Sequence, residues 1–386
     1  MIKPQTIRSI NDIESRLNAS SRVLCLYSGG LDGTFLLHRL VNSRCARIIA
    51  LCVDLGGDPT TREIEERGQA LGVETIFFDA KDAFANDFVA PSIIAQATYL
   101  GTHPICASLS RPLIARVAYD IAMREGCDML LHTSSRSQNS LRRFNGALAA
   151  LGFKGNYGSP FEETTIPRKV KIDKLIKAGI PITISSLFST DTNLWGREFE
   201  YGELDDPEHV TVPESLYHWT KYTTEEPEQK ICIRFEAGRP VAVNGSAHDL
   251  ANLIKELNIN VGRFGIGRYI GLEEIEDGRK VQEVREMPAA AILFDSYRRI
   301  EAACLSAECI REKISQEQLW VREAVEGRWF GSLRTAAQAF MDTIAKSVSG
   351  QVSYRINPSN MQFTSVIADN PLYIRNRDRY ESADHI

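Results

Sequence analysis

The segment Leu26-Tyr-Ser-Gly-Gly-Leu-Asp-Gly-Thr34 decides the fold, because it joins a strand to a helix through a glycine turn. The apolar run at residues 22–27 predicts a buried strand, and the periodic apolar residues at 35–41 predict a helix. Backbone N–H groups at a helix start lack partners inside the helix, and the helix dipole adds positive potential there. Gly29 and Gly30 let the backbone approach an anion closely, so we expect a phosphate-binding loop.

This loop differs from the two commonest phosphate-binding motifs. It lacks the Gly-Lys-Ser/Thr ending of the Walker type and the Gly-x-Gly-x-x-Gly pattern of dinucleotide folds. Ser28 and Thr34 add hydroxyl groups, and Asp32 adds a carboxylate. The pattern Ser-Gly-Gly-x-Asp-x-Ser/Thr resembles the PP-loop of ATP pyrophosphatases, which cleave ATP between its α and β phosphates. An ordinary turn between a strand and a helix is the alternative interpretation.

The composition is that of an ordinary globular protein. The 386 residues leave room for two domains at roughly 150 residues each. The net charge of −5 gives no basic surplus for binding nucleic acid. The eight cysteines include no Cys-x-x-Cys pair, which favours reduced thiols in a cytoplasmic protein. No apolar segment is long enough for a signal peptide or a membrane span, so we expect neither nucleic acid nor a membrane as partner.

Strand-like and helical runs alternate along the first half of the chain. This order predicts an α/β fold with a parallel sheet covered on both faces, and ligands on such sheets bind at the carboxyl ends of the strands. The strands are expected at 22–27, 47–53, 74–78 and 129–132, and the helices at 35–41, 61–71 and 112–125.

The second half has a different sequence pattern, which begins with a loop-rich, acidic stretch at 187–227. We expect residues 1–21 to be an N-terminal extension, 22–186 a nucleotide-binding domain and 187–386 an α+β domain. In the last of these, the sequence predicts a hairpin at 230–243, a helix at 247–257, three amphipathic helices within 288–350 and a closing hairpin at 352–367.

Several further blocks, in order, extend the PP-loop resemblance to one family. The chain is similar to argininosuccinate synthases along nearly its whole length. The matching blocks are Tyr27-Ser-Gly-Gly-Leu-Asp32, Val53-Asp-Leu-Gly56, Ser108-Leu-Ser-Arg-Pro-Leu-Ile-Ala-Arg116, Asn193-Leu-Trp-Gly-Arg197, Gly202-Glu-Leu-Asp-Asp-Pro207, Gly265-Ile-Gly-Arg268, Glu286-Met-Pro288 and Gly327-Arg-Trp-Phe330.

This resemblance implies a nucleotide-binding α/β domain followed by a synthetase domain. Enzymes of the family attach AMP to the ureido oxygen of citrulline with release of pyrophosphate, and the amine of aspartate then displaces AMP. ATP and Mg²⁺ are the implied cofactors, and Mg²⁺ suits the departing pyrophosphate. Such chemistry needs positioning and charge neutralisation rather than a covalent nucleophile. We see no Ser/His/Asp triad in the sequence.

The resemblance also assigns roles to individual residues. Asp32 and Arg111 are the implied catalytic residues, although Arg111 has a salt bridge at a helix start as its alternative role. The implied nucleotide-binding residues are Leu26, Tyr27, Ser28, Gly29, Gly30, Asp32, Gly33, Thr34, Val53, His132 and Ser135. The implied substrate-binding positions are His103, Ser108, Asn139, Ser140, Arg143, Ser189, Glu198, Glu273 and Arg285. Asn139 and Arg143 lie four apart at a predicted helix start and should project together.

Departures from the family pattern gather at the substrate positions and spare the PP-loop. His103 and Arg285 stand where the family has tyrosines, and Glu198 stands where it has a serine. Ser135 replaces a threonine and keeps a hydroxyl. Ser140 replaces an aspartate suited to a substrate ammonium, and a neutral hydroxyl gives far less Coulomb attraction. Near them, Arg136 and Gln138 replace two glycines.

We therefore predict a carbon–nitrogen ligase that adenylates a ureido or amide oxygen and has a specificity shifted from citrulline and aspartate. A true argininosuccinate synthase is the nearest alternative. A PP-loop enzyme that modifies tRNA and a nucleotide sensor without turnover are alternatives of other classes. The resemblance also implies small-molecule, amino-acid-like substrates and a homo-oligomer, a dimer or tetramer, with the family's C-terminal arm shortened in this chain.

Overall fold

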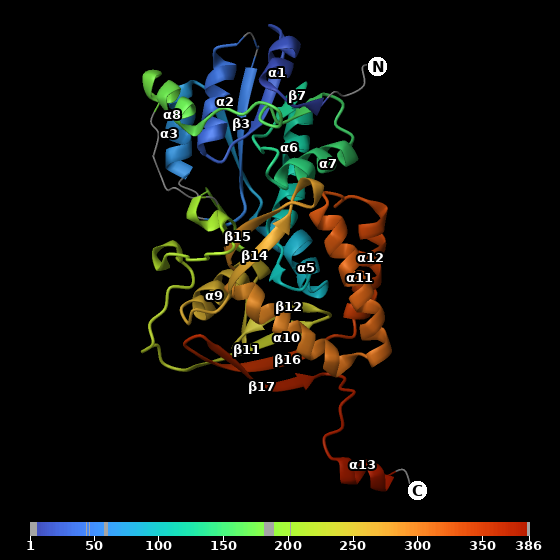
Figure 1. Cartoon of the computed structure of the whole chain (residues 1–386). Helices are drawn as coiled ribbons and strands as arrows, with labels where there is room; N and C mark the ends of the chain where they lie inside the picture. Colours follow the sequence, from blue (N-terminus) through green and yellow to red (C-terminus); the bar gives the residue numbers. More distant parts are fainter. Residues whose placement is uncertain are drawn as a thin grey trace.

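A parallel six-stranded sheet forms the upper part of the computed structural model, which describes residues 6–43, 45, 47–57, 61–180, 189–200 and 202–383 (Figure 1). In sheet order the strands are β1 (Thr6–Ile7), β8 (Asn156–Gly158), β7 (Met129–Leu131), β2 (Arg22–Leu26), β3 (Arg47–Asp54) and β4 (Glu74–Asp79). The helices around it are α1 (Ile10–Arg16), α2 (Leu31–Val41), α3 (Thr61–Leu71), α6 (Ala107–Glu125), α7 (Ser140–Leu151) and α8 (Arg168–Lys177). The predicted α/β class with a parallel sheet is confirmed.

The strand order reverses at β2. From β2 the chain winds outward through β3 to β4, and it later returns to the other side of β2 with β7 and β8. The carboxyl ends of β2 and β7 therefore flank a topological switch point, where ligands bind in open α/β sheets. The glycine loop follows β2 and the segment from His132 follows β7, so the order of strands brings these two loops together.

The described residues before β2 belong to this sheet, which corrects the prediction of an N-terminal extension outside it. Thr6 and Ile7 pair in parallel with Tyr157 and Gly158 of β8. Ser9 caps α1 through a capping box with Asp12. A two-residue edge strand is too short for periodicity to reveal.

Two helices start earlier than predicted. Helix α2 begins at Leu31 because Gly29 and Gly30 make the turn and Gly30 serves as the N-cap. Helix α6 begins at Ala107 and contains Pro112, although we expected proline to mark its first turn. Both Leu109 and Ser110 donate their N–H groups to the Cys106 carbonyl, which tightens the first turn ahead of the proline.

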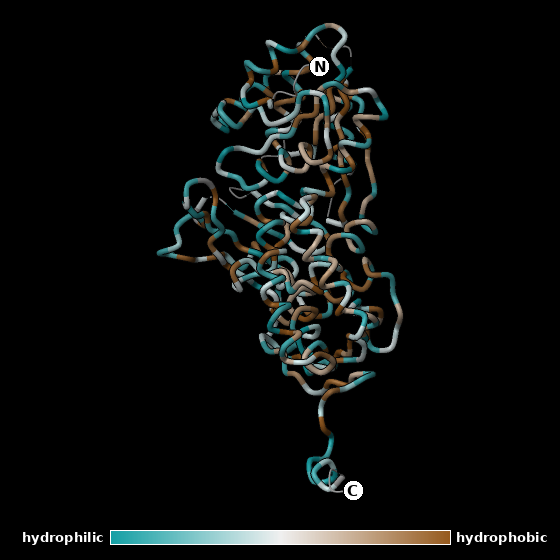
Figure 2. The backbone as a smooth tube through the Cα atoms, turned by 90° about the vertical axis from the view of Figure 1, so that its right-hand side faces the viewer, coloured by the Kyte–Doolittle hydropathy of each residue, from teal (hydrophilic) through white to brown (hydrophobic). Residues whose placement is uncertain are grey.

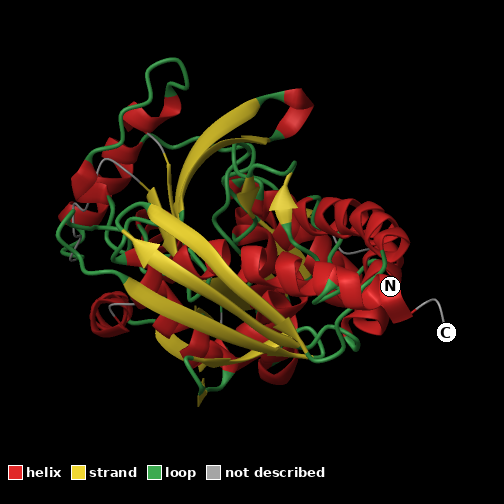
Figure 3. Ribbon diagram, turned by 90° about the horizontal axis from the view of Figure 1, so that it is seen from below, coloured by secondary structure: helices red, strands yellow, loops and turns green. Residues whose placement is uncertain are grey.

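The lower part holds two antiparallel sheets (Figure 3). The four-stranded sheet has the order β14 (Arg268–Glu274), β15 (Lys280–Glu286), β10 (Arg197–Glu200) and β9 (Ser189–Thr192). The five-stranded sheet has the order β13 (Ser246–Ala247), β12 (Arg239–Val243), β11 (Gln229–Glu236), β16 (Gly350–Asn357) and β17 (Asn360–Ala368). The two predicted hairpins are β11–β12 and β16–β17.

Helices pack beside these sheets. They are α9 (Leu250–Gly262), α10 (Pro288–Cys304), α11 (Ala307–Val325) and α12 (Ser332–Ala345), so the three amphipathic helices predicted within 288–350 are present. The segment between β4 and α6 contains α4 (Lys81–Phe84), a π-helical turn (Ala85–Val89), α5 (Ala90–Ile94), β5 (Thr98–Tyr99) and β6 (His103–Pro104). Short 3₁₀ turns lie at Gly202–Asp205, Glu214–Leu216 and Glu276–Gly278. The expected domain boundary after residue 186 lies outside the described residues.

One hydrophobic core runs through both parts of the molecule. It joins Leu24 and Leu130 of the parallel sheet to Trp195, Phe235 and Trp320 of the lower part. A second core covers the other face of the parallel sheet beneath α2, α3 and α8. Figure 2 shows hydrophobic and hydrophilic stretches alternating along the chain in both parts. The shared core fixes the orientation of the parallel sheet relative to the antiparallel sheets, which the site requires.

The end of the chain leaves the body as an arm. After β17 it extends away from the fold and ends in the short helix α13 (Arg377–Ala383), which lies apart from the body in Figures 1 and 2. Leu372 is 62% exposed, Ile374 50% and Tyr380 54%, although the Leu372 N–H bonds to the Ala303 carbonyl at 2.9 Å. The shortening of this arm and the homo-oligomer remain predictions.

Candidate active site

Two glycines shape the loop after β2 into an anion-binding turn. Gly29 has φ +77°, and a Cβ there would lie 2.7 Å from Ile64 Cγ1 of α3. Gly30 is the N-cap of α2 and provides no side chain to bond the first turn. The first N–H groups of α2 therefore face the loop, together with the positive end of the helix dipole. The turn has the geometry that the sequence predicts, and the binding of phosphate by it stays a prediction.

The side chains of the loop divide into two groups. The Thr34 hydroxyl is buried, donates to the Gly30 carbonyl at 2.8 Å and lies 3.1 Å from the Tyr27 hydroxyl. Burial raises the pKa of Tyr27, so this residue stays a neutral phenol. Thr34 and Tyr27 thus hold the turn together, whereas Ser28 is exposed on it and presents its hydroxyl. At Gly33 a Cβ would lie 2.9 Å from the Tyr27 ring.

Two cations that the sequence analysis did not single out reach the loop from neighbouring helices. Arg67 of α3 donates to the Gly29 carbonyl oxygen. Lys171 of α8 places Nζ 2.6 Å from Asp32 Oδ1 in the first turn of α2. Both residues lie outside the motifs and far along the chain from the loop. The basic composition of residues 168–177 is the one signal that points toward Lys171.

The ends of β3 and β7 flank the loop. Val53 is partly buried, and the following Asp54 accepts from the Gly56 N–H at 2.8 Å and from Lys81 Nζ at 2.7 Å. His132 is buried, which lowers its pKa to about 4 and keeps it neutral. The hydrogen bonds assign its proton to Nε2, which lies 3.1 Å from Asn145 Oδ1. The His132 side chain therefore anchors the loop from inside.

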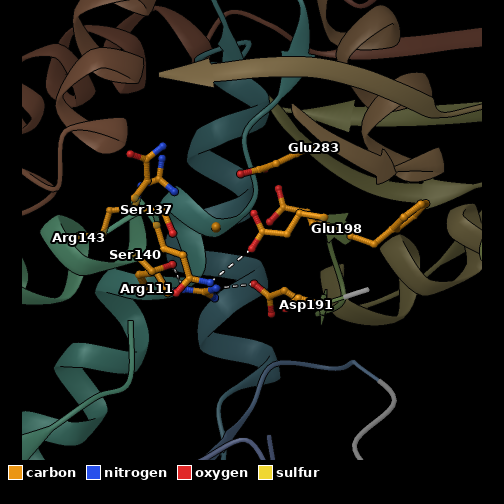
Figure 4. A pocket seen from close by; sticks show the side chains of 13 residues that line it. Arg111, Ser137, Ser140, Arg143, Asp191, Glu198 and Glu283 are labelled. Carbon is orange, nitrogen blue, oxygen red and sulfur yellow. Dashed lines mark hydrogen bonds and ion pairs between the residues drawn. The ribbon is translucent and has the colours of Figure 1, made fainter. Parts of the chain in front are cut away.

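The segment after β7 leads into a polar cavity of about 80 Å³ (Figure 4). One wall is the segment from Ser137 to the start of α7, and the other is the face of the four-stranded sheet. The sequence-predicted residues that line it are Arg111, Asn139, Ser140, Arg143, Ser189 and Glu198. The lining residues that were not predicted include Ser137, Gln138, Asp191, Glu200 and Glu283.

Glu273 joins the two walls. It is 6% exposed and accepts from Asn139 Nδ2 at 2.9 Å and from Arg143 Nη2. The expected convergence of Asn139 and Arg143 thus takes place on this carboxylate. Arg285 approaches from the other side, with Nη2 2.9 Å from Glu273 Oε2. Burial alone would raise the pKa of Glu273, but Arg143 and Arg285 outweigh it and hold the pKa at about 2.

Arg285 is the centre of a buried ionic cluster. It is 1% exposed and donates through Nε to Glu198 Oε1 at 2.8 Å, and it also contacts Glu283. Glu198 and Arg285 are direct cross-strand partners on β10 and β15. Residues two apart on a strand share a face, so Glu200 and Glu283 join them on the same side of the sheet. The spacings Glu-x-Glu and Glu-x-Arg are the sequence signal for this charged face.

Carboxylates outnumber guanidinium groups around the cavity. Burial raises the pKa of Glu283 to about 8 and that of Glu200 to about 7. Burial also raises the pKa of Glu198, against the attraction of Arg285. The site therefore holds protons near neutral pH, and a cationic group in the cavity would favour their release.

Arg111 lies on the wall opposite the sheet. It donates through Nε to Ser140 Oγ at 2.9 Å and pairs with Asp191 at 2.6 Å, as Figure 4 shows. Arg111 therefore forms a salt bridge, as in its alternative role, and both partners of this salt bridge line the cavity. Ser140, which the resemblance places where the family has an aspartate, thus accepts a hydrogen bond from an arginine.

The remaining predicted substrate residues lie at different depths. Ser189 is exposed at the start of β9, whereas Ser108 is buried in the first turn of α6. His103 is buried, with Nδ1 2.9 Å from Thr102 Oγ1, and burial with nearby Arg285 lowers its pKa to about 4. Ser135 lies in the loop between β7 and α7, and its hydroxyl is 3.1 Å from that of Ser137.

None of the helices in the described part of the chain is long and apolar enough to cross a membrane. The parallel sheet, the glycine loop at its switch point and the adjacent polar cavity together define a PP-loop ATP-binding protein. Two family models match the chain. Residues 22–181 match the Arginosuccinate synthase N-terminal HUP domain, and residues 188–386 match the Arginosuccinate synthase C-terminal domain.

Curated relatives match over most of the chain. The argininosuccinate synthase of Symbiobacterium thermophilum is 35% identical over 95% of this chain and 92% of its own length. That of Pyrococcus furiosus is 32% identical over 93% of this chain and 88% of its own. That of Dictyoglomus turgidum is 35% identical over 91% of this chain and 88% of its own. The chain belongs to the argininosuccinate synthase family, and it is an ATP-dependent ligase that forms a carbon–nitrogen bond.

Proposed function

We propose that this ligase adenylates a ureido or amide oxygen and condenses the activated carbon with an amine, and that at least one substrate differs from citrulline or aspartate. A ureido oxygen is a poor leaving group and its carbon a weak electrophile. The oxygen forms a bond to the α-phosphorus of ATP while the bond to the β-phosphate oxygen breaks and pyrophosphate leaves. The amine nitrogen then bonds to the carbon, AMP leaves with the oxygen, and the amine releases a proton.

The loop residues support the first step through positioning and charge. Gly29, Gly30 and the N-terminus of α2 would bind the phosphate oxygens, with the exposed Ser28 hydroxyl beside them. Mg²⁺ is bound in proteins by one or two carboxylates together with phosphate oxygens, and Asp32 is a 43% exposed carboxylate beside this turn. Asp32 therefore fits the metal, which would neutralise the departing pyrophosphate.

The proposal of altered specificity rests on the hydrogen bonds that the Glu273 carboxylate already accepts. By resemblance this carboxylate contacts citrulline, yet here Asn139, Arg143 and Arg285 all donate to it. Arg285 also brings Glu198 into the cluster as a buried partner. A zwitterionic substrate would therefore meet a carboxylate already neutralised by two arginines. The remaining carboxyl groups of the cavity are those of Glu200 and Glu283, which bind protons near neutral pH because burial raises their pKa values.

Argininosuccinate synthesis from citrulline and aspartate is the second candidate. The names of the curated relatives favour it, since they are argininosuccinate synthases at 32–35% identity over nearly the whole chain. In that case the cluster around Arg285 would rearrange when substrate binds, and Glu273 would exchange an arginine for the substrate ammonium.

Release of pyrophosphate distinguishes the two candidates. The purified full-length protein is supplied with ATP, Mg²⁺, citrulline and aspartate, and then with a panel of ureas, amides and amines. We expect negligible turnover with citrulline plus aspartate and turnover with another pair. Full turnover with citrulline plus aspartate would instead establish the second candidate. Absence of AMP with every pair would contradict both.

A further inference from the structure

We propose that Lys171 binds the polyphosphate of ATP and the pyrophosphate that leaves it. The proposal rests on the proposed function for the identity of the leaving group, and on the family's use of ATP for the site. Neither the loop motif nor the substrate positions include this residue. Its ammonium would contact the phosphate oxygens directly during the adenylation step.

The fold brings Lys171 to the loop from the far end of the parallel domain. Helix α8 packs against α2 beside the sheet, as Figure 1 shows. Lys171 is three residues into α8, and its side chain extends across the Phe161 ring with Nζ 4.6 Å from the ring centroid. It ends 2.6 Å from Asp32 Oδ1. The ammonium is therefore at the first turn of α2, where the phosphate groups are expected.

The burial of this lysine is not explained by stability alone. Its side chain is 10% exposed, whereas its partner Asp32 is 43% exposed. A partly exposed carboxylate is well solvated, and a pair of this kind adds little net stability. Desolvating an ammonium carries a cost that one such pair offsets only in part. A second anion at the same place would supply the missing compensation.

The ammonium group of Lys171 is chemically suited to bind the pyrophosphate as it leaves. It carries three N–H donors on one carbon stem, of which the Asp32 carboxylate takes one. Lysine acts as a point charge toward phosphate, so its attraction tolerates a change in oxygen positions as the α–β bond breaks. Lys171 also balances the negative charge of Asp32, which otherwise would repel phosphate at the helix N-terminus.

Lys174 offers a matched control one turn further along α8. It carries the same charge and also lies over an aromatic ring, with Nζ 5.9 Å from the centroid of Phe35. Removing Lys174 changes the net charge and the helix surface as the removal of Lys171 does. A general loss of electrostatic attraction would affect both variants equally.

Calorimetric titration with inorganic pyrophosphate tests the proposal, with and without Mg²⁺, on the full-length protein. We expect Lys171→Met to weaken pyrophosphate binding about tenfold or more, because hydrogen bonds between charged groups are stronger than those between neutral groups. Lys174→Met should bind as the wild type does, and Lys171→Arg should retain part of the affinity. If Lys171→Met does not fold, Lys171→Gln takes its place.

Unchanged pyrophosphate affinity in the folded Lys171→Met or Lys171→Gln variant would overturn the proposal, even where its melting temperature falls. Equal weakening in Lys174→Met would overturn it as well. The titration needs no amino-acid substrate, so its result is independent of specificity. Failure of the proposed function appears separately, as absence of AMP with every substrate pair in the wild-type protein.

Discussion

Glu198 Oε1 lies 2.8 Å from Arg285 Nε, and the two residues face each other directly across antiparallel strands. Both side chains are buried at 9% exposure or less. A buried charge without its partner is strongly unfavourable, so the two substitutions depend on each other. By the resemblance, the family has a serine and a tyrosine at these positions, so we infer that the two departures act as one change that introduces an ion pair.

Removal of Arg285 should destabilise the whole molecule. Arg285→Met leaves Glu198, Glu273 and Glu283 close together in a buried site without their shared cation. We expect the free energy of unfolding, measured with urea, to fall by about 3–5 kcal/mol. Arg62→Met is the control, because Arg62 is 90% exposed in its pair with Glu66, and its effect should be within about 0.5 kcal/mol. A loss of the same small size in both variants would contradict the buried cluster.

The joint replacement of the pair should move specificity toward citrulline. Glu198→Ser with Arg285→Tyr introduces the residue types that the resemblance assigns to the family at these positions, and it frees Glu273 from one of its two arginines. We expect kcat/KM for citrulline with aspartate to rise at least tenfold over the wild type, measured by pyrophosphate release. Glu198→Ser alone leaves Arg285 with less compensation and should not produce this gain. An unchanged double variant would place the specificity elsewhere in the pocket.

The sequence predicted the parts of the site that depend on short spacing. The turn at Gly29 and Gly30, and the convergence of Asn139 with Arg143, follow from local geometry that a single segment defines. Contacts between distant segments could not be predicted from local spacing, because they depend on how helices pack and how strands pair. Lys171 reaches Asp32 only because α8 packs on α2, and Glu198 meets Arg285 only through strand register. Register depends on the whole sheet, so the sequence left open whether those two charges pair or bind substrate.

Gly29 should be essential for nucleotide binding. In Gly29→Ala the new Cβ would lie 2.7 Å from Ile64 Cγ1 in addition to the strain of φ +77°. We expect the KM for ATP to rise tenfold or more, because α3 or the loop must move. Gly179→Ala is the matched control, since Gly179 has φ +72° with no heavy atom near its Cβ position. It should share the backbone strain, with a KM for ATP like that of the wild type. Equal KM values for the two variants would show that contact with Ile64 is unimportant.

The excess of buried carboxylates should make stability depend on pH. The pKa of Glu283 is raised from 4.5 to about 8 by burial, so the folded protein binds a proton that the unfolded chain has lost. The free energy of unfolding therefore decreases as pH rises from about 4.5 to about 8, because only the folded protein holds a proton on Glu283 in this range. Glu283→Gln keeps an acceptor for Arg285 without a titratable group. We expect its melting temperature to rise relative to the wild type between pH 5 and pH 9, as judged by thermal melts at each pH.

Glu274→Gln is the control for this experiment, because Glu274 is exposed on the same strand as Glu273. Its melting temperature should follow that of the wild type at every pH. Glu200, whose pKa burial raises from 4.5 to about 7, remains in both variants and should leave a smaller decrease in stability between about pH 4.5 and pH 7. Parallel curves for Glu283→Gln and the wild type would mean that Glu283 is ionised throughout, with Arg285 outweighing the effect of burial on its carboxyl group.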